Sequence, residues 1–306
     1  MCRCESTCTW GIRGTTPNKR CKQHVRKSDC VPELPEVETV CRSLRLLVHG
    51  KTVRDVRVTL PRIVRTPRDP KEFAWRLRGV TIEGIARRGK YILFDMSPYS
   101  LVSHLRMEGR YGLYAESDAL EAHTHVVFAF TDGTELRYRD VRQFGTMDLI
   151  AFQKFDLIEG LRTLGPEPLS AVFTVQAFRE IVQKRSMKIK QALLDQTCVA
   201  GLGNIYVDET LFDAGIHPAR PCNELTEGEI GRIHASIQKV LAEAVDAGGS
   251  SIKSYVNGHG EVGKFQLLLK AYGRTGQACL NCGSAIEKVK LSGRGTHYCP
   301  TCQQMG

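Results

Sequence analysis

Four cysteines near the C-terminal end of the chain have the residue type and spacing of a metal site. Cys279 and Cys282 form one C-x-x-C pair, Cys299 and Cys302 form a second, and 16 residues lie between the pairs. Each C-x-x-C turn offers two thiolates, and two such turns complete a closed tetrahedral site for Zn²⁺. A closed site leaves no position for a substrate, so the pattern predicts one structural zinc ion in a zinc ribbon.

The segment 290-KLSGRGTHY, between the two cysteine pairs, contains a second candidate. Arg294 lies between two glycines, which let a backbone hairpin approach a ligand closely. On spacing alone, however, a solvated arginine on a hairpin is the simpler interpretation. Its planar guanidinium fork would suit a phosphate group if one came within reach.

The balance of charge narrows the class of partner. The 306-residue chain has 43 Lys and Arg against 33 Asp and Glu, which gives a net charge of +10 and a pI of about 9.1. This surplus favours a polyanionic partner, either nucleic acid or an anionic membrane surface. No apolar run approaches the roughly 18 residues of a membrane span, and the N-terminus lacks the apolar core of a secretory signal. We therefore expect a protein of a reducing compartment without a membrane partner.

The first 30 residues differ in composition from the rest. They contain five of the twelve cysteines, and seven Lys or Arg against two Asp or Glu, without helical or strand periodicity. Such a polar stretch is predicted to be disordered. Without it the net charge falls by seven minus two, so residues 31–306 remain basic at +5. The other single cysteines, Cys41, Cys198 and Cys222, are expected to be buried thiols.

Periodicity predicts the elements that must position these groups. From Glu33 apolar residues recur at three- and four-residue steps, with Pro35 in the first turn, which predicts an amphipathic helix to about His49. Short alternating segments follow between residues 51 and 152, with a hairpin signal at Asp132-Gly133. Six to eight strands in this span predict an antiparallel sandwich or barrel.

The remaining half of the chain changes character, as expected for a protein of two or three domains. The segment 165-GPEPLS is typical of a linker, and the Gly-rich 254-SYVNGHGEVG is predicted to be a mobile loop before the cysteine pairs. The region between them is predicted to be all-helical, because helical periodicity covers 174–185, 187–196, 204–215 and 225–249.

Several blocks of the sequence resemble the formamidopyrimidine-DNA glycosylases, in the same order and across residues 32–306. The PELPE opening separates the chain from the related endonuclease VIII group, whose opening resembles PEGPE. The blocks are 32-PELPEVETV, 87-RRGKY, 103-SHLRMEGRY, 140-DVRQFG, 200-AGLGNIYVDE and 293-GRGTHYCPTCQQ.

The resemblance implies an α+β multidomain fold: an N-terminal helix with an antiparallel β-sandwich, a helix-two-turn-helix domain and a C-terminal zinc ribbon finger. We expect an extension over 1–31, a catalytic sandwich domain over 32–165, a DNA-binding domain over 166–260, and the end of a lesion loop with the finger over 261–306. The implied function is removal of oxidised purines, 8-oxoguanine and formamidopyrimidines, from double-stranded DNA. Cleavage of the strand by β,δ-elimination follows. The implied enzyme is monomeric, contains one zinc ion, and works in the bacterial cytoplasm at the nucleoid.

The resemblance also assigns the chemistry to particular residues. Pro32 matches the amine nucleophile, which displaces the base and forms a Schiff base with the sugar. Glu33 matches the acid-base residue beside it, Lys90 a phosphate contact that assists β-elimination, and Arg294 the finger arginine that assists δ-elimination. Without the resemblance, Pro32 and Glu33 would be ordinary residues of a helix start and Lys90 a solvated strand lysine.

Further residues match the DNA contacts of the family. Three match the side chains that fill the gap left by a flipped base, four match phosphate contacts, and four are expected to line the lesion pocket. For Met107 and Phe144, packing in the core is the alternative to filling the gap. For Asn204, capping of a helix is the alternative to contacting phosphate. The sets are Met107, Arg142 and Phe144; His123, Arg185, Lys190 and Asn204; and Glu36, Glu108, Ser254 and Tyr255.

The position of Pro32 departs from the family pattern, in which the proline is the mature N-terminus. Here 31 residues precede it, and a proline inside a chain has an amide nitrogen that is not nucleophilic. Three explanations remain open: translation begins at Val31 from a GUG codon, an Arg-rich targeting segment is cleaved, or the extension is retained and the protein binds lesions without cutting. A zinc-ribbon RNA or transcription factor is a more distant alternative that leaves Glu33 and Lys90 unexplained.

Overall fold

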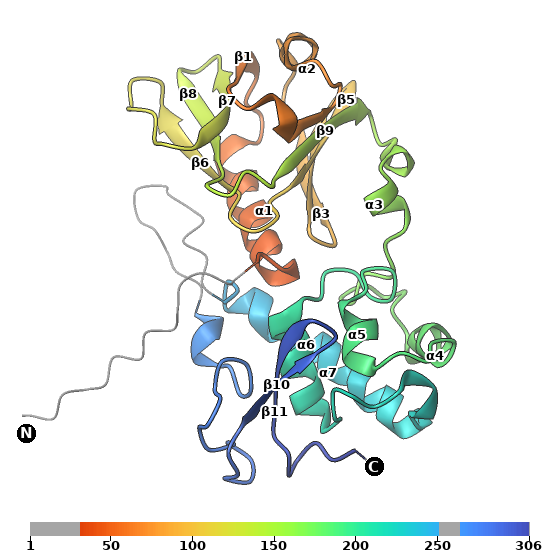
Figure 1. The fold of residues 1–306 in the computed structure, drawn as a ribbon. Coiled ribbons are helices and arrows are strands. Elements are labelled where there is room, and N and C mark those ends of the chain that lie inside the picture. The colour runs from red at the N-terminus through yellow and green to blue at the C-terminus, as the bar shows by residue number, and fades with distance from the viewer. Residues whose placement is uncertain (1–30, 251–263, 306) are drawn as a thin grey trace, which may run out of the picture.

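A computed structural model describes residues 31–250 and 264–305. The chain forms an upper lobe of strands and a lower lobe of helices with a small hairpin (Figure 1). The predicted disorder of residues 1–30 and the predicted mobile loop over 254–263 lie outside the described residues.

The upper lobe is a β-sandwich, as predicted. One sheet has the order β1-β7-β8-β6, and the other has the order β2-β9-β5-β4-β3. Strands β2 and β9 pair in parallel, whereas the other pairs are antiparallel. The strands are β1 (Val53–Val58), β2 (Val64–Thr66), β3 (Gly84–Arg88), β4 (Tyr91–Met96), β5 (Tyr99–His104), β6 (Arg110–Ala115), β7 (Thr124–Phe130), β8 (Thr134–Arg139) and β9 (Thr146–Ala151).

The span of residues 53–151, all of which the structure describes, thus has one strand more than the predicted maximum of eight. The prediction missed β2 because a three-residue strand is too short to alternate. Its partner β9 lies far along the chain, so no local turn signal marks the pair.

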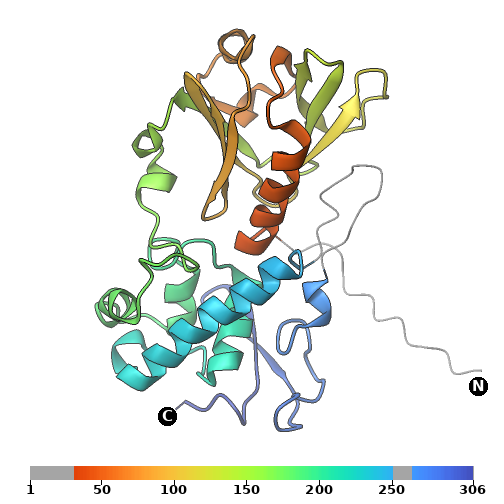
Figure 2. The same cartoon turned by 180° about the vertical axis from the view of Figure 1, so that it is seen from behind.

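Helix α1 (Leu34–Val48) carries the N-terminal block into the space between the lobes, and it matches the predicted helix within one residue at each end. Its first turn is closed by the Glu33 amide, which donates to Oε2 of Glu36 over 2.9 Å. Val37, Val40, Leu44 and Val48 of α1 are buried in the sandwich core, whereas Leu34 belongs to the core of the helical lobe. Seen from behind, the start of α1 lies beside the long helix α7 (Figure 2).

The lower lobe is helical, as predicted, and the hairpin of the finger packs against its helix α6. Nearly every residue of α6 is buried, so this helix forms the centre of the lobe.

The remaining helices of both lobes are α2 (Pro70–Leu77) on the sandwich, α3 (Glu159–Arg162) in the connection, and α4 (Val175–Gln183), α5 (Ile189–Leu194), α6 (Asn204–Ala214) and α7 (Glu227–Asp246) in the lower lobe. Short 3-10 turns are η1 (Pro61–Ile63), η2 (Phe155–Leu157), η3 (Cys222–Glu224) and η4 (Phe265–Leu267), and the finger hairpin is β10 (Glu287–Leu291) with β11 (Arg294–Tyr298).

The connection between the lobes is fastened to the turn between β3 and β4. Glu167 accepts hydrogen bonds from Arg87 Nη1 at 2.8 Å and Arg88 Nη1 at 3.1 Å, and also from the Gly89 amide. Lys90, the next residue, is therefore carried on a turn that both lobes hold. Among the described residues, the structure has no helix whose length and apolar character would let it cross a bilayer.

Candidate active site between the two lobes

The side chain of Glu33 lies where the start of α1 meets the start of α6. It is only 3% exposed, and its Oε1 accepts a hydrogen bond from the Ile205 amide at 3.1 Å. Its Oε2 is buried and has no partner among the described residues. Pro32 is also buried beside it. A buried carboxyl oxygen without a partner is costly, which is typical of a group that meets a ligand.

Gly203 shapes the space for this carboxyl group. A Cβ at position 203 would lie 2.2 Å from Cδ of Glu33 and 2.4 Å from its Oε1. Because a shift of about 1 Å in a reacting group can cost about a hundredfold in rate, we expect Gly203→Ala to reduce turnover by that order. Single-turnover kinetics would measure the loss.

Gly228→Ala is the matched control, because Gly228 is exposed on α7 and a Cβ there meets nothing within 4 Å. Alanine there should leave turnover unchanged and stabilise the helix by at most about 1 kcal/mol. Equal turnover of the two variants would contradict the importance of the Gly203 contact.

Lys90 and Glu33 form an ionisable pair in a desolvated place. The Lys90 ammonium donates to the Leu202 carbonyl at 2.8 Å, so a residue of the sandwich lobe reaches into the helical lobe. Burial raises the pKa of Glu33 from 4.5 to about 7, against the opposing charge of Lys90. Burial lowers the pKa of Lys90, against the attraction of Glu33 and Glu36, and the charge of Arg294 lowers it further. A carboxyl group with a pKa near neutrality can both give and take a proton at physiological pH.

Asn204 and Arg294 bring the finger to the same place. Asn204 Nδ2 donates to the Gly295 carbonyl at 3.0 Å, while its Oδ1 is buried without a partner among the described residues. Arg294 is exposed at the start of β11, and its charge acts on both Lys90 and Lys190. The amide, the start of α6 and the arginine together suit an anion such as a phosphate.

Two loops of the sandwich present the residues expected to fill a gap in DNA. Phe144 is 53% exposed, and the Arg142 guanidinium lies 5.4 Å from its ring centroid. Core packing, the alternative for Phe144, is therefore wrong. Met107 is partly buried in the neighbouring loop. The exposed aromatic ring and its arginine suit insertion between bases.

Strained backbone supports both loops. Arg106 and Gln143, which adjoin these residues, have φ values of 56° and 59°, which side-chain-bearing residues rarely adopt. His104 Nδ1 accepts from the Arg106 amide at 3.0 Å, and burial lowers the pKa of His104 to about 3, which keeps this acceptor unprotonated. Asp140, fully buried, accepts from the amides of Arg142 at 3.1 Å and Gly145 at 2.8 Å.

The hydroxyl group of Tyr138, which donates to Asp140 Oδ2 at 3.4 Å, also lies against both loops. A Cβ on Gly109 would come within 2.2 Å of the Tyr138 hydroxyl oxygen, and one on Gly145 within 1.7 Å. Only glycine fits at these approaches, so the two loops are fixed relative to each other.

Other expected contact residues are placed less directly. Arg185 donates to Asp195 at 2.5 Å and to Thr197 at 3.0 Å, and His123 is exposed. Lys190 is buried, and it donates hydrogen bonds to Asp208 and to the Gly295 carbonyl, both within the protein. Its direct contact with phosphate stays a prediction, on a side chain that the structure does not place at the surface.

The expected lesion pocket is only partly described. Glu36 is fully buried, and it accepts from Tyr206 at 2.6 Å and from the Ser250 amide at 2.7 Å. Its contacts hold the start of α1 against the helical lobe, and its role toward a lesion stays a prediction. Glu108 is partly buried beside Met107. Ser254 and Tyr255 lie outside the described residues.

Sequence reasoning missed several residues that support the site. They share one property, a buried or bridging carboxylate that accepts several hydrogen bonds, and the partners of Glu167 and Asp208 are distant in sequence. A signal existed for one of them, because an aspartate stands inside the apolar helix 204–214. These residues are Asp140, Glu167 and Asp208.

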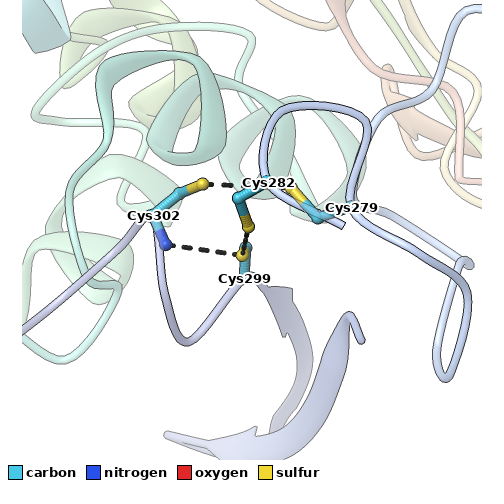
Figure 3. Close-up of side chains that lie close together, drawn as sticks. All are labelled: Cys279, Cys282, Cys299 and Cys302. Carbon is cyan, nitrogen blue, oxygen red and sulfur yellow. Dashed lines mark hydrogen bonds between the residues drawn. The ribbon is translucent and has the colours of Figure 1, made fainter. Parts of the chain in front are cut away.

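The four cysteines of the finger converge, as predicted (Figure 3). Their sulfur atoms all lie within 4.8 Å of one another, with Cys279 and Cys302 at 3.9 Å and Cys282 and Cys299 at 3.4 Å. Sulfur atoms about 2.3 Å from a tetrahedral zinc ion would be separated by about 3.8 Å. The cluster is therefore consistent with one structural zinc ion.

Comparison with family models matches the three parts of the chain separately. A model described as the formamidopyrimidine-DNA glycosylase N-terminal domain matches residues 31–147. The formamidopyrimidine-DNA glycosylase H2TH domain matches residues 164–256, and a zinc finger found in FPG and IleRS matches residues 276–304.

Individual relatives give the same result over most of the chain. Formamidopyrimidine-DNA glycosylase of Brevibacillus brevis is 58% identical over 274 residues, which cover 90% of this chain and 99% of that protein. The Bacillus subtilis protein of the same name is 50% identical over 273 residues, or 89% and 99% of the two chains. A solved complex of Lactococcus lactis Fpg with DNA containing an abasic site has a TM-score of 0.82 and 45% identity, covering 89% of this chain and 99% of that one. A complex of the Lactococcus lactis protein with Fapy-dG containing DNA has a TM-score of 0.82 and 46% identity, covering 89% and 100%.

Proposed function

This chain belongs to the formamidopyrimidine-DNA glycosylase family, and from that premise we propose that the Glu33 site is its reaction centre. The protein is a bifunctional DNA glycosylase and abasic-site lyase that acts on oxidised purines in DNA. The observation that carries the placement of the chemistry is the buried carboxyl group beside Pro32, with one oxygen free of partners among the described residues.

Pro32 is the nucleophile when its nitrogen is a free amine. The amine attacks C1′ of the damaged nucleotide, the C1′–N bond breaks with its electron pair going to the base, and the proton that the amine loses goes to the departing base. Glu33, protonated near neutral pH, donates a proton to the sugar ring oxygen as the ring opens to the iminium. The start of α6, whose Ile205 amide donates to Glu33, holds the carboxyl group in place.

The iminium makes the neighbouring C2′ proton acidic, which allows the strand to be cut. β-elimination removes that proton and breaks the bond from C3′ to the phosphate oxygen. Lys90 contacts the phosphate beside the lesion and assists this step. Arg294 on the finger binds a phosphate through its planar fork and assists the following δ-elimination.

The rest of the interface binds the damaged duplex. Met107, Arg142 and Phe144 fill the space of the flipped nucleotide, and the basic surplus of residues 31–306 attracts the phosphate backbone. Asn204, Arg185, Lys190 and His123 are assigned to phosphate, and Glu36, Glu108, Ser254 and Tyr255 to the lesion pocket. The protein acts as a monomer at the nucleoid in the bacterial cytoplasm.

Borohydride trapping tests the nucleophile, because it reduces the Schiff base to a stable covalent adduct. A chain that begins at Pro32 should be trapped on duplex containing 8-oxoguanine opposite cytosine, whereas the chain that begins at Met1 should not. A chain that begins at Val31 is the matched control, since a single extra residue converts the proline nitrogen to an amide.

Efficient trapping of the Met1 chain without processing would contradict the assignment of Pro32. Lesion binding without any trapping by the Pro32 chain would instead support a non-catalytic lesion-binding protein. Intact mass of the endogenous protein identifies which N-terminus is used.

A further inference from the structure

A buried carboxylate that the proposed chemistry does not use lies under the finger hairpin. Asp208 projects from α6 with a fully buried side chain, and its Oδ1 accepts from the Lys190 ammonium at 2.6 Å. Its Oδ2 accepts from the His297 amide at 2.8 Å and lies 3.2 Å from Nδ1 of the same residue. The amide and Nδ1 of His297 thus make two contacts that join α6 to β11, the strand that begins with Arg294.

The residue directly after Arg294 is held from the same side. The Gly295 carbonyl accepts from Lys190 Nζ at 2.9 Å and from Asn204 Nδ2 at 3.0 Å. Lys190 therefore bridges Asp208 and Gly295, and Thr296 between the two anchors is fully buried. Three consecutive residues of β11 are fixed on the helical lobe, so the direction of Arg294 is set by α6 as well as by its own hairpin.

The ion pair of Lys190 and Asp208 is buried, and the net contribution of a buried ion pair to the stability of the fold is small. Taking both charges out of water costs free energy, which their attraction only offsets. A hydrophobic pair would hold the hairpin at no such cost, but it would not fix its direction. Hydrogen bonds from both a backbone amide and an ammonium fix direction, because they weaken steeply when bent.

We propose that Asp208 is a positioning residue for Arg294, and that it aims the guanidinium at the phosphate that leaves in the second elimination. The inference rests on the proposed role of Arg294. In that step the conjugated iminium left by β-elimination loses its C4′ proton to water and the C5′–O bond breaks, so that the phosphate on C5′ leaves with the electron pair. The sugar remnant stays on Pro32 as a conjugated iminium until water releases it.

The test compares Asp208→Asn and His297→Phe with Arg294→Ala, all in the chain beginning at Pro32. Asparagine keeps the shape of Asp208 without its charge, and phenylalanine keeps the ring contact of His297 with Tyr272, whose centroids are 4.9 Å apart. On duplex with a preformed abasic site, the ratio of δ- to β-elimination product should fall about tenfold to a hundredfold in Asp208→Asn. It should fall less in His297→Phe, and borohydride trapping should stay within about twofold of the unaltered chain in both.

Hydrogen exchange of the peptide covering β11 provides a readout of position without activity. Faster exchange there in Asp208→Asn, with unchanged exchange in the sandwich, supports the anchor. A parallel loss of trapping and δ-product would mean general damage and overturn the proposal, as would an unchanged product ratio. If Arg294→Ala itself leaves the ratio unchanged, the role of Arg294 fails; if only Asp208→Asn leaves it unchanged, the positioning inference alone fails.

Discussion

Replacing Glu33 with glutamine is expected to slow excision of 8-oxoguanine by roughly a hundredfold to ten-thousandfold, the usual contribution of a general acid. The amide keeps the shape that accepts the Ile205 amide, but it has no proton to give to the opening sugar. Cleavage of a preformed abasic site should fall much less, since its sugar is already free to open. Single-turnover rates on the two substrates measure the difference.

The pH dependence of this reaction follows from the same residue. The pKa of Glu33 is raised from 4.5 to about 7, chiefly by burial. Between these two pH values the folded protein therefore keeps a proton on Glu33 that the unfolded chain loses. Excision should therefore decline as the pH rises above about 7, and this decline should be absent in Glu33→Gln. The stability contribution has the same sign: it is present below pH 4.5 and is lost as the pH rises from 4.5 to about 7.

Glu72→Gln serves as the control for both measurements. Glu72 lies on α2, pairs with Arg76 and has a side chain that is 42% exposed. Its replacement should change neither the rate nor the pH profile. A wild-type excision rate in Glu33→Gln would rule out Glu33 as the acid.

Removal of zinc is expected to unfold the finger and abolish most strand cleavage while the sandwich remains folded. Structural zinc contributes about 10 kcal/mol or more to small finger domains, which exceeds what the two-stranded hairpin of β10 and β11 could supply alone. Arg294 would then lose its fixed position. Cys282→Ser, which replaces an exposed ligand, should lower the zinc content, speed hydrogen exchange across residues 276–304 and reduce δ-product below detection.

Cys222→Ala is the control for the loss of a thiol. Cys222 is buried in the helical core, away from the four-cysteine cluster, so this variant should retain one zinc ion per chain and its cleavage activity. Full β,δ-elimination by zinc-free protein would contradict the structural role of the metal.

The sequence predicted those parts of the fold whose signals are local. The helix from Glu33 was predictable because a proline in the first turn and an apolar stripe lie within one segment. Strand β2 was not, since its parallel partner β9 is about eighty residues away and no turn joins them. The zinc cluster was predictable because each C-x-x-C pair is itself a local turn.

The candidate site divides in the same way. The motif blocks named Glu33, Lys90 and Arg294, but their convergence depends on contacts between lobes that no local pattern contains. Asp140 and Asp208 were missed because each accepts hydrogen bonds from backbone amides. Nearly every residue type has such an amide, so the sequence does not mark these partners. What distinguishes such residues is burial, which becomes visible only once the fold is known.

The hydrogen bond from Lys90 to the Leu202 carbonyl has a consequence for the entropy of the reaction. A lysine side chain has about 2 kcal/mol of rotamer freedom to lose when it is ordered. Here much of that freedom is already lost in the folded protein, because the ammonium is tethered and its turn is held by Glu167. Ordering of this lysine is thus a cost of folding, and little of it remains to raise the activation barrier when the damaged strand arrives.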